Sequence, residues 1–242
     1  MHQTSGSDSK MLMGDEEEKK EEEAHPVVPM RLHSFDPNVA SVEEFEELGT
    51  DLADQYSFGE LRNTHEQNVV LADVEQAKLF ELWHELRDLG LATPNIGLLT
   101  DIICCPGGDF CSLANAKSIP IAEAIQRRFD DLDYLFDIGN IDLNISGCMN
   151  ACGHHHVGHI GILGVDKKGQ EFYQVSLGGS AGRDASLAQI LGPSFAEADM
   201  ADVIDKIVKV YVERRTEEES FLDTFRRIGV DPFKERVYAA NH

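Results

Sequence analysis

Positive charge is scarce in this chain. Lys and Arg number 21 against 44 Asp and Glu, and the formal net charge is −23. Nucleic acids and anionic membranes repel such a balance, which excludes a general binder of either. The chain also lacks the roughly 18 consecutive apolar residues of a transmembrane helix, and its N-terminus lacks the basic and apolar segments of a secretory signal. We therefore expect a cytoplasmic protein with no nucleic-acid or membrane partner.

Cysteine is absent from most of the sequence. The five cysteines fall in one window, at Cys104, Cys105, Cys111, Cys148 and Cys152. A disulfide framework usually belongs to a secreted protein and is spread over its fold. Clustered cysteines in a cytoplasmic chain instead indicate metal binding or redox chemistry. Four ligands and one spare thiol are the simplest interpretation.

Apolar residues are few at the N-terminus. Residues 1–26 are polar and include the charged run Asp15–Glu23. Such a segment cannot bury enough apolar surface to offset the entropy lost on ordering, so we predict a disordered acidic tail. The chain as a whole is 42% hydrophobic, which suffices for a core from about residue 27 onward.

Hydrophobic patterning predicts an α+β fold. A helix is expected from Asp73, which with Gln76 forms a capping-box pattern, to a stop at Gly90. A second helical region after the first cysteine loop is expected to break at Ser118 and Pro120. We expect strands at Val27–Leu32, Gly59–Leu71, Ile96–Ile103, Ile141–Ile145, His159–Val165 and Glu171–Leu177. The apolar face of the first helix is expected at Ala77, Phe80, Trp83, Leu86 and Leu89, and further helices are expected at Ala201–Arg215 and Phe221–Ile228.

The cysteines form two pairs with defined spacing. Five residues separate Cys105 from Cys111, and three separate Cys148 from Cys152. Each pair follows a predicted strand in a glycine-containing loop, where backbone N–H groups can approach an inorganic core. This pattern favours an iron–sulfur cluster. Structural zinc, which fits only the second spacing, and buried free thiols are the alternatives.

The cysteine motifs carry a family resemblance. Thr100–Cys111 followed by Ile145–Gly153 resembles the siroheme and [4Fe–4S] domain of sulfite and nitrite reductases, with Met149 where the family usually has proline. The continuation His154–Gly164 is similar to the hemoprotein (beta) subunit of bacterial assimilatory sulfite reductases. Gly59–Asn68 resembles the strand that opens the family's second ferredoxin-like half-domain.

The resemblance implies an organisation and a set of site residues. It implies a ferredoxin-like half-domain at 27–95 and an α/β cluster-binding domain with a helical extension at 96–242. The implied ligands of a [4Fe–4S] cluster are Cys105, Cys111, Cys148 and Cys152, the last of which would also bridge to siroheme iron. The resemblance places Arg62, Asn68 and Asn150 near the siroheme, and Cys152 and Arg62 are expected to be catalytic. Lys117 is a further catalytic candidate, because its charge could neutralise anionic groups. His154, His155, His156 and His159 would form a loop beside the cofactor or, alternatively, hold a separate metal.

By the same resemblance, the expected function is six-electron reduction of sulfite to sulfide. Nitrite reduction, a non-catalytic subunit of a larger reductase, and a plain [4Fe–4S] electron carrier are the alternatives. The expected electron donor is a flavoprotein subunit or a ferredoxin. A polypeptide resembling the family's N-terminal half, or a second copy of this chain, would complete the cationic cleft that siroheme carboxylates require. Alternatively, the chain is a compact siroheme reductase that acts by itself.

Overall fold

The structure, a computed structural model, describes residues 28–31 and 51–239. The predicted acidic tail at 1–26 lies outside the described residues. Within those ranges, no helix is both long and apolar enough to cross a membrane. The described chain contains two separate hydrophobic cores, one among residues 52–91 and the other among residues 98–237.

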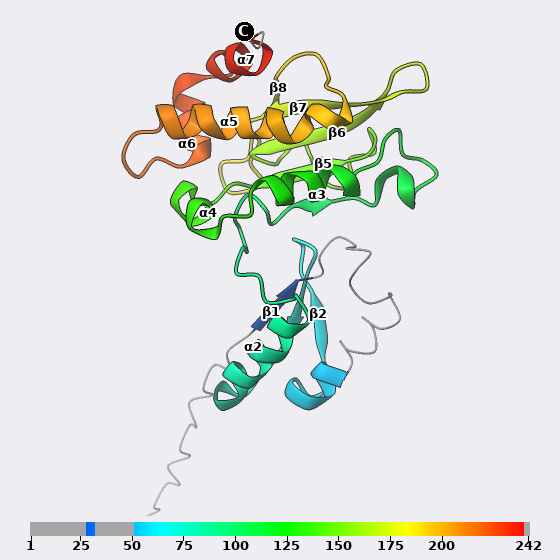
Figure 1. Cartoon of the computed structure of the whole chain (residues 1–242), viewed down its shortest axis with the longest axis vertical. Coiled ribbons are helices and arrows are strands. Elements are labelled where there is room, and N and C mark those ends of the chain that lie inside the picture. Colours follow the sequence, from blue (N-terminus) through cyan, green and yellow to red (C-terminus); the bar gives the residue numbers. More distant parts are fainter. Residues whose placement is uncertain (1–27, 32–50, 240–242) are drawn as a thin grey trace, which may run out of the picture.

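A small antiparallel sheet organises the first region. Its strands are β1 (Val28–Arg31), β2 (Leu61–Asn63) and β3 (Asn68–Leu71), in the order β1-β3-β2 (Figure 1). The predicted strand at Val27–Leu32 is confirmed. The single long strand predicted over Gly59–Leu71 is wrong, because the chain reverses between β2 and β3. The Thr64 hydroxyl accepts the backbone N–H groups of Glu66 and Asn68 and holds this turn together.

The helix of the first region, α2 (Leu79–Asp88), starts later than the sequence predicts. A short 3₁₀ turn (η1, Gln76–Lys78) precedes it, and the predicted capping role of Asp73 is wrong because this residue has a φ of 56° before the turn. The predicted apolar face is wrong in part, since Phe80 is 72% and Trp83 43% exposed. The buried side chains are Leu82 and Leu86. The predicted stop is confirmed, with Gly90 at a φ of 72°.

A five-stranded mixed sheet forms the second region. Its strands are β4 (Ile103–Cys104), β5 (Leu143–Ser146), β6 (Ile160–Asp166), β7 (Glu171–Leu177) and β8 (Gln189–Ile190), in that order across the sheet. The strands β4, β5 and β6 are parallel, and β7 and β8 continue the sheet in antiparallel fashion. The predicted β6–β7 hairpin is confirmed. The strand predicted over Ile96–Ile103 is wrong for most of its length, because only its last residue joins the sheet.

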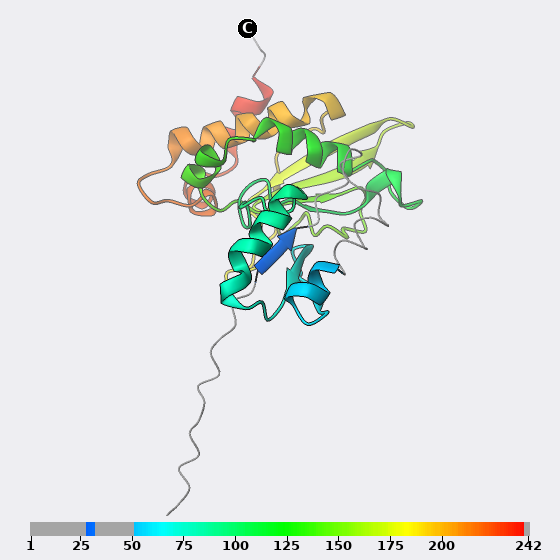
Figure 2. The same ribbon diagram turned by 60° about the horizontal axis from the view of Figure 1, so that its bottom comes forward.

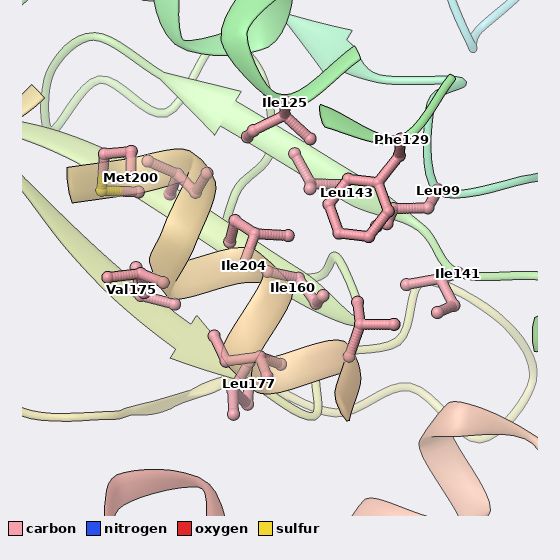
Figure 3. Close-up of a cluster of buried hydrophobic side chains, with 14 of the residues drawn as sticks. Leu99, Ile125, Phe129, Ile141, Leu143, Ile160, Val175, Leu177, Met200 and Ile204 are labelled. Atoms are coloured by element: carbon pink, nitrogen blue, oxygen red, sulfur yellow. The ribbon is translucent and has the colours of Figure 1, made fainter. Parts of the chain in front are cut away.

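Helices cover this sheet and complete the larger core. They are α3 (Ile119–Arg128), α4 (Leu132–Ile138), α5 (Met200–Arg214), α6 (Phe221–Ile228) and α7 (Asp231–Tyr238). Figure 2 shows α3 and α5 side by side over the sheet. In Figure 3, Ile204 of α5 and Ile125 of α3 point toward Leu143, Ile160 and Val175 of the strands. The two C-terminal helices predicted from periodicity are confirmed, as is the α+β class.

The region between the first cysteine loop and α3 differs from its prediction. No helix forms immediately after Cys111, where turns lead instead to Ser118 and α3. A short 3₁₀ turn, η2 (Gly107–Asp109), lies between Cys105 and Cys111. The predicted helical piece before Ser118 is therefore wrong. Glycine and short polar residues favour turns, and in this loop that preference outweighs the helical spacing of the few apolar residues.

Candidate iron–sulfur centre

Parallel strand pairing brings the two cysteine loops together. Ile103 is paired with Asn144, and Cys104 with Ile145. The backbone N–H of Cys105 donates to the carbonyl of Ile145 at 3.1 Å, which extends this pairing by one step. Because both strands run in the same direction, their carboxyl ends lie at the same edge of the sheet. The two loops therefore leave the sheet next to each other.

Glycines let the two loops pack backbone against backbone. A Cβ on Gly147 would lie 2.6 Å from the carbonyl oxygen of Ala116 and 2.9 Å from Cα of Gly107. The carbonyl of Gly147 also accepts the N–H groups of Asn115 and Ala116, at 2.8 and 3.0 Å. Any side chain at position 147 would separate the loops. Glycine is therefore required here for close approach of the backbone.

One sulfur already accepts a backbone hydrogen bond. The N–H of Gly147, in the second loop, donates to Sγ of Cys105, in the first loop, at 3.0 Å. Hydrogen bonds of this kind stabilise thiolate ligands of iron–sulfur clusters and tune their reduction potentials. The contact joins residues 42 positions apart.

The cysteines differ in exposure. Cys105 and Cys148 are buried, Cys111 is half-buried and Cys152 is exposed. The neighbouring Cys104 is half-buried, and burial together with the adjacent Cys105 raises the pKa of its thiol to about 12. The Cys104 thiol donates to the backbone carbonyl of Cys105 at 3.2 Å. This hydrogen bond agrees with Cys104 as the spare cysteine.

Among the described residues, no three His, Cys, Asp or Glu side chains converge as ligands of one metal ion. This finding covers the histidine segment, for which a separate metal was an alternative. A [4Fe–4S] cluster does not need such convergence, because each of its four cysteines binds a different iron atom.

The two cations predicted to be catalytic form ion pairs within the chain. Arg62 on β2 contacts Glu60 at 2.7 Å and Asp73 at 3.5 Å. Lys117 contacts Asp109, a residue of the first cysteine loop, at 3.0 Å. Lys117 therefore lies beside the cysteines, whereas both recorded partners of Arg62 belong to its own small region.

The predicted asparagines have different environments. Asn150 is exposed in the second cysteine loop. Asn68 is buried at the start of β3, and its Oδ1 has no hydrogen-bond partner among the described residues. A buried acceptor without a partner is costly, so Oδ1 of Asn68 is available to a group that this protein binds.

A glutamine without a predicted role connects the two regions. The side-chain amide of Gln67 donates to the carbonyl of Cys104 at 3.0 Å and accepts the N–H of Cys104 at 2.8 Å. It thereby satisfies both backbone groups of one residue on the edge strand β4. The sequence signal was weak, because Gln67 is one polar residue in a polar turn and its partner lies 37 positions away.

Two of the histidines after Cys152, His155 and His159, have lowered pKa values. The Nδ1 of His159 accepts the N–H of Asp142 at 3.1 Å, and burial lowers the pKa of His159 despite the nearby Asp142 carboxylate. Burial, with a contribution from His156, also lowers the pKa of His155. The Nδ1 atom of His155 has no partner in the part of the chain that the structure describes. Neutral imidazoles can both accept and donate protons.

Comparison with known proteins agrees with this arrangement. Residues 98–241 match the nitrite and sulphite reductase 4Fe-4S domain, and residues 41–89 match the nitrite/sulfite reductase ferredoxin-like half domain. Sulfite reductase (ferredoxin) 2 of Mycolicibacterium paratuberculosis is 31% identical over 194 residues, which cover 76% of this chain and 35% of that protein. Chloroplastic ferredoxin–nitrite reductase of Spinacia oleracea is 32% identical over 178 residues, which cover 69% of this chain and 28% of that protein.

Solved structures share the fold. The NirA protein of Mycobacterium tuberculosis aligns with a TM-score of 0.70 at 27% identity, over 86% of this chain and 39% of that chain. Dissimilatory sulfite reductase I aligns with a TM-score of 0.71 over 89% of this chain and 69% of that chain, and at 14% identity this likeness concerns the fold alone.

The chain belongs to the nitrite and sulfite reductase family. Membership implies a [4Fe–4S] cluster and siroheme as cofactors. The residues present fit them: four thiols on two loops that pack closely through Gly147, and the Oδ1 of buried Asn68, which has no partner among the described residues. The chain spans about a third of the length of the curated relatives it matches.

Proposed function

We propose that this chain takes part in the six-electron reduction of sulfite to sulfide, with a [4Fe–4S] cluster held by Cys105, Cys111, Cys148 and Cys152. The observation that carries the proposal is the bond from the Gly147 N–H to Sγ of Cys105, which joins the two cysteine loops. We include in the proposal the half-domain at 27–95, the cluster-binding domain at 96–242 and a cytoplasmic location.

We assign a separate role to each of the chain's site residues. When bound, the cluster and siroheme supply the electron-transfer chemistry. Buried Cys105 and Cys148 would anchor the cluster, and exposed Cys152 would also hold the siroheme iron. Asn68 and Asn150 would contact the cofactor, and Lys117, already beside the cysteines, would provide positive charge toward an anionic substrate. His155 and His159 would form part of a loop beside the cofactor, where a neutral imidazole can accept a proton and pass it on.

Sulfite is proposed over nitrite because His154–Gly164 is similar to the sulfite enzymes. Relatives with sulfite reductase and with nitrite reductase names have nearly the same identity to this chain. Turnover of each anion by the same cofactor-loaded protein, with an artificial reductant, distinguishes the two. A higher kcat/KM for nitrite than for sulfite would contradict the assignment.

A second candidate is a subunit that completes a larger reductase. It is favoured by the ion pairs of Arg62, whose charge is already balanced by Glu60 and Asp73. The partner would be a polypeptide like the family's N-terminal half or a second copy of this chain. A ferredoxin, which the relatives' names include, or a flavoprotein subunit would donate electrons.

The test uses the full chain, purified and reconstituted without oxygen. Its siroheme content, iron content and mass are measured on one sample. Iron with a strong Soret band and sulfite turnover supports the sulfite reductase. Siroheme without turnover favours the subunit. Cysteine-ligated iron without siroheme, with one broad absorption near roughly 400 nm, indicates an electron carrier. Protein that takes up only zinc contradicts the cluster assignment.

A further inference from the structure

Ser118 has a buried hydroxyl that faces a cysteine sulfur. The residue precedes α3 and is 0% exposed. Its Oγ lies 3.5 Å from Sγ of Cys105. No other partner of this oxygen is recorded within residues 28–31 and 51–239. A buried hydroxyl needs a partner, and here the sulfur supplies it.

The start of α3 explains why the hydroxyl is free to turn toward the sulfur. A serine at this position usually accepts the N–H of the second or third helical residue. Here the second residue is Pro120, which has no N–H, and Ser118 makes no such capping bond. The loop packing also restricts the side chain, since a Cβ on Gly107 would lie 2.7 Å from Oγ of Ser118.

The direction of the hydrogen bond follows from the chemistry of the ligand. A cysteine bound to iron is a thiolate, which has no proton to donate. The Ser118 hydroxyl must therefore donate to Sγ of Cys105, beside the N–H of Gly147 at 3.0 Å. Within the described residues, no hydrogen bond reaches the sulfurs of Cys111, Cys148 or Cys152. The sulfur of Cys105 is thus the one with two donors.

We propose that Ser118 is a positioning residue that raises the reduction potential of the cluster through Cys105. This inference rests on the proposed function, because it requires the cluster. Reduction adds one negative charge, which spreads partly onto the ligand sulfurs. A donor directed at a sulfur stabilises the reduced state more than the oxidised state, and the potential rises.

The experiment compares Ser118→Ala and Ser118→Thr with the wild-type chain, all reconstituted with iron, sulfide and siroheme. The cluster potential is measured by redox titration monitored by electron paramagnetic resonance. We expect a more negative potential in Ser118→Ala at unchanged iron content, and a potential near wild type in Ser118→Thr. Ser176→Ala is the matched control, because it removes another buried hydroxyl, one that contacts the Gly161 carbonyl.

An unchanged potential in Ser118→Ala, or a shift no larger than that of Ser176→Ala, would overturn the inference. Should Ser118→Ala fail to assemble a cluster, Ser118→Cys replaces it as a weaker donor of similar size. Its potential should then lie below that of the wild type, and an equal potential would again overturn the inference. A wild-type chain that binds no cluster contradicts the proposed function instead, so the two failures are distinguishable.

Discussion

The two regions of this chain differ in the size of their core and in their relation to the cysteines. The small region has strands of three or four residues, one helix and exposed aromatic side chains such as Phe80 and Trp83. The larger region has a continuous core beneath α3 and α5, and its parallel strands end at the cysteines. The proposed ligands therefore all lie in the larger region, which the small region contacts through the Gln67 amide. The comparison indicates that ligand placement depends on the larger sheet.

The largest expected effect is loss of the cluster in Cys148→Ser. This change removes one of four thiolates from the buried side of the site, and a serine hydroxyl is a much poorer ligand for iron. Iron and acid-labile sulfide should fall from roughly four per chain to near zero. Cys104→Ser is the matched control and should retain its cluster, because Cys104 is the spare thiol. Equal loss in both variants would mean that the ligand set is assigned wrongly.

The small region should depend on Leu82 rather than on the aromatic residues that periodicity suggested. Leu82 is fully buried, so Leu82→Ala should lower the free energy of unfolding by about 2–5 kcal/mol through lost burial and a cavity. Phe80→Ala should change it by less than about 0.5 kcal/mol. Thermal and denaturant unfolding measure both. A larger effect at Phe80 would show that this face of α2 is covered in the folded protein.

The contact between the cysteine loops is tested by Gly147→Ala. The added Cβ would meet the Ala116 carbonyl at 2.6 Å, and backbone there cannot move away without disturbing the sheet. We expect a loss of about 1–3 kcal/mol in the free energy of unfolding, together with weaker cluster retention. Gly182→Ala is the control, since its nearest neighbour would lie 3.4 Å away. Similar stability in the two variants would argue against tight loop packing.

A smaller effect is expected at the junction between the regions. In Gln67→Glu, the carboxylate keeps the bond from the Cys104 N–H but cannot donate to the Cys104 carbonyl. The change should lower the free energy of unfolding by about 1–2 kcal/mol and speed backbone hydrogen exchange near the junction. Glu66→Gln, at the preceding exposed position, should leave exchange unchanged. Exchange that is equally slow in Gln67→Glu and wild type would mean that the two regions are held together elsewhere.

Local sequence patterns were sufficient to predict several helices and strands. The β6–β7 hairpin, α5 and α6 lie where alternation, helical spacing and turn residues predict them. Prediction failed where a short apolar run is compatible with either a strand or a turn. The run Gly59–Leu71 forms two strands because Thr64 holds a turn that its apolar pattern does not reveal. The run Ile96–Ile103 is mostly turns, although its composition suits a strand.

The sequence by itself determined the two cysteine motifs, their spacing and the glycines between them, because these are properties of short segments. Only the tertiary structure decided that Gly147 and Ser118 reach Cys105 and that Gln67 reaches Cys104. These contacts join residues between 13 and 42 positions apart. The Gly147 contact exists because β4 pairs in parallel with β5, and the Gln67 contact exists because the turn between β2 and β3 reaches β4. Periodicity within a segment carries no information about which distant segment will lie beside it.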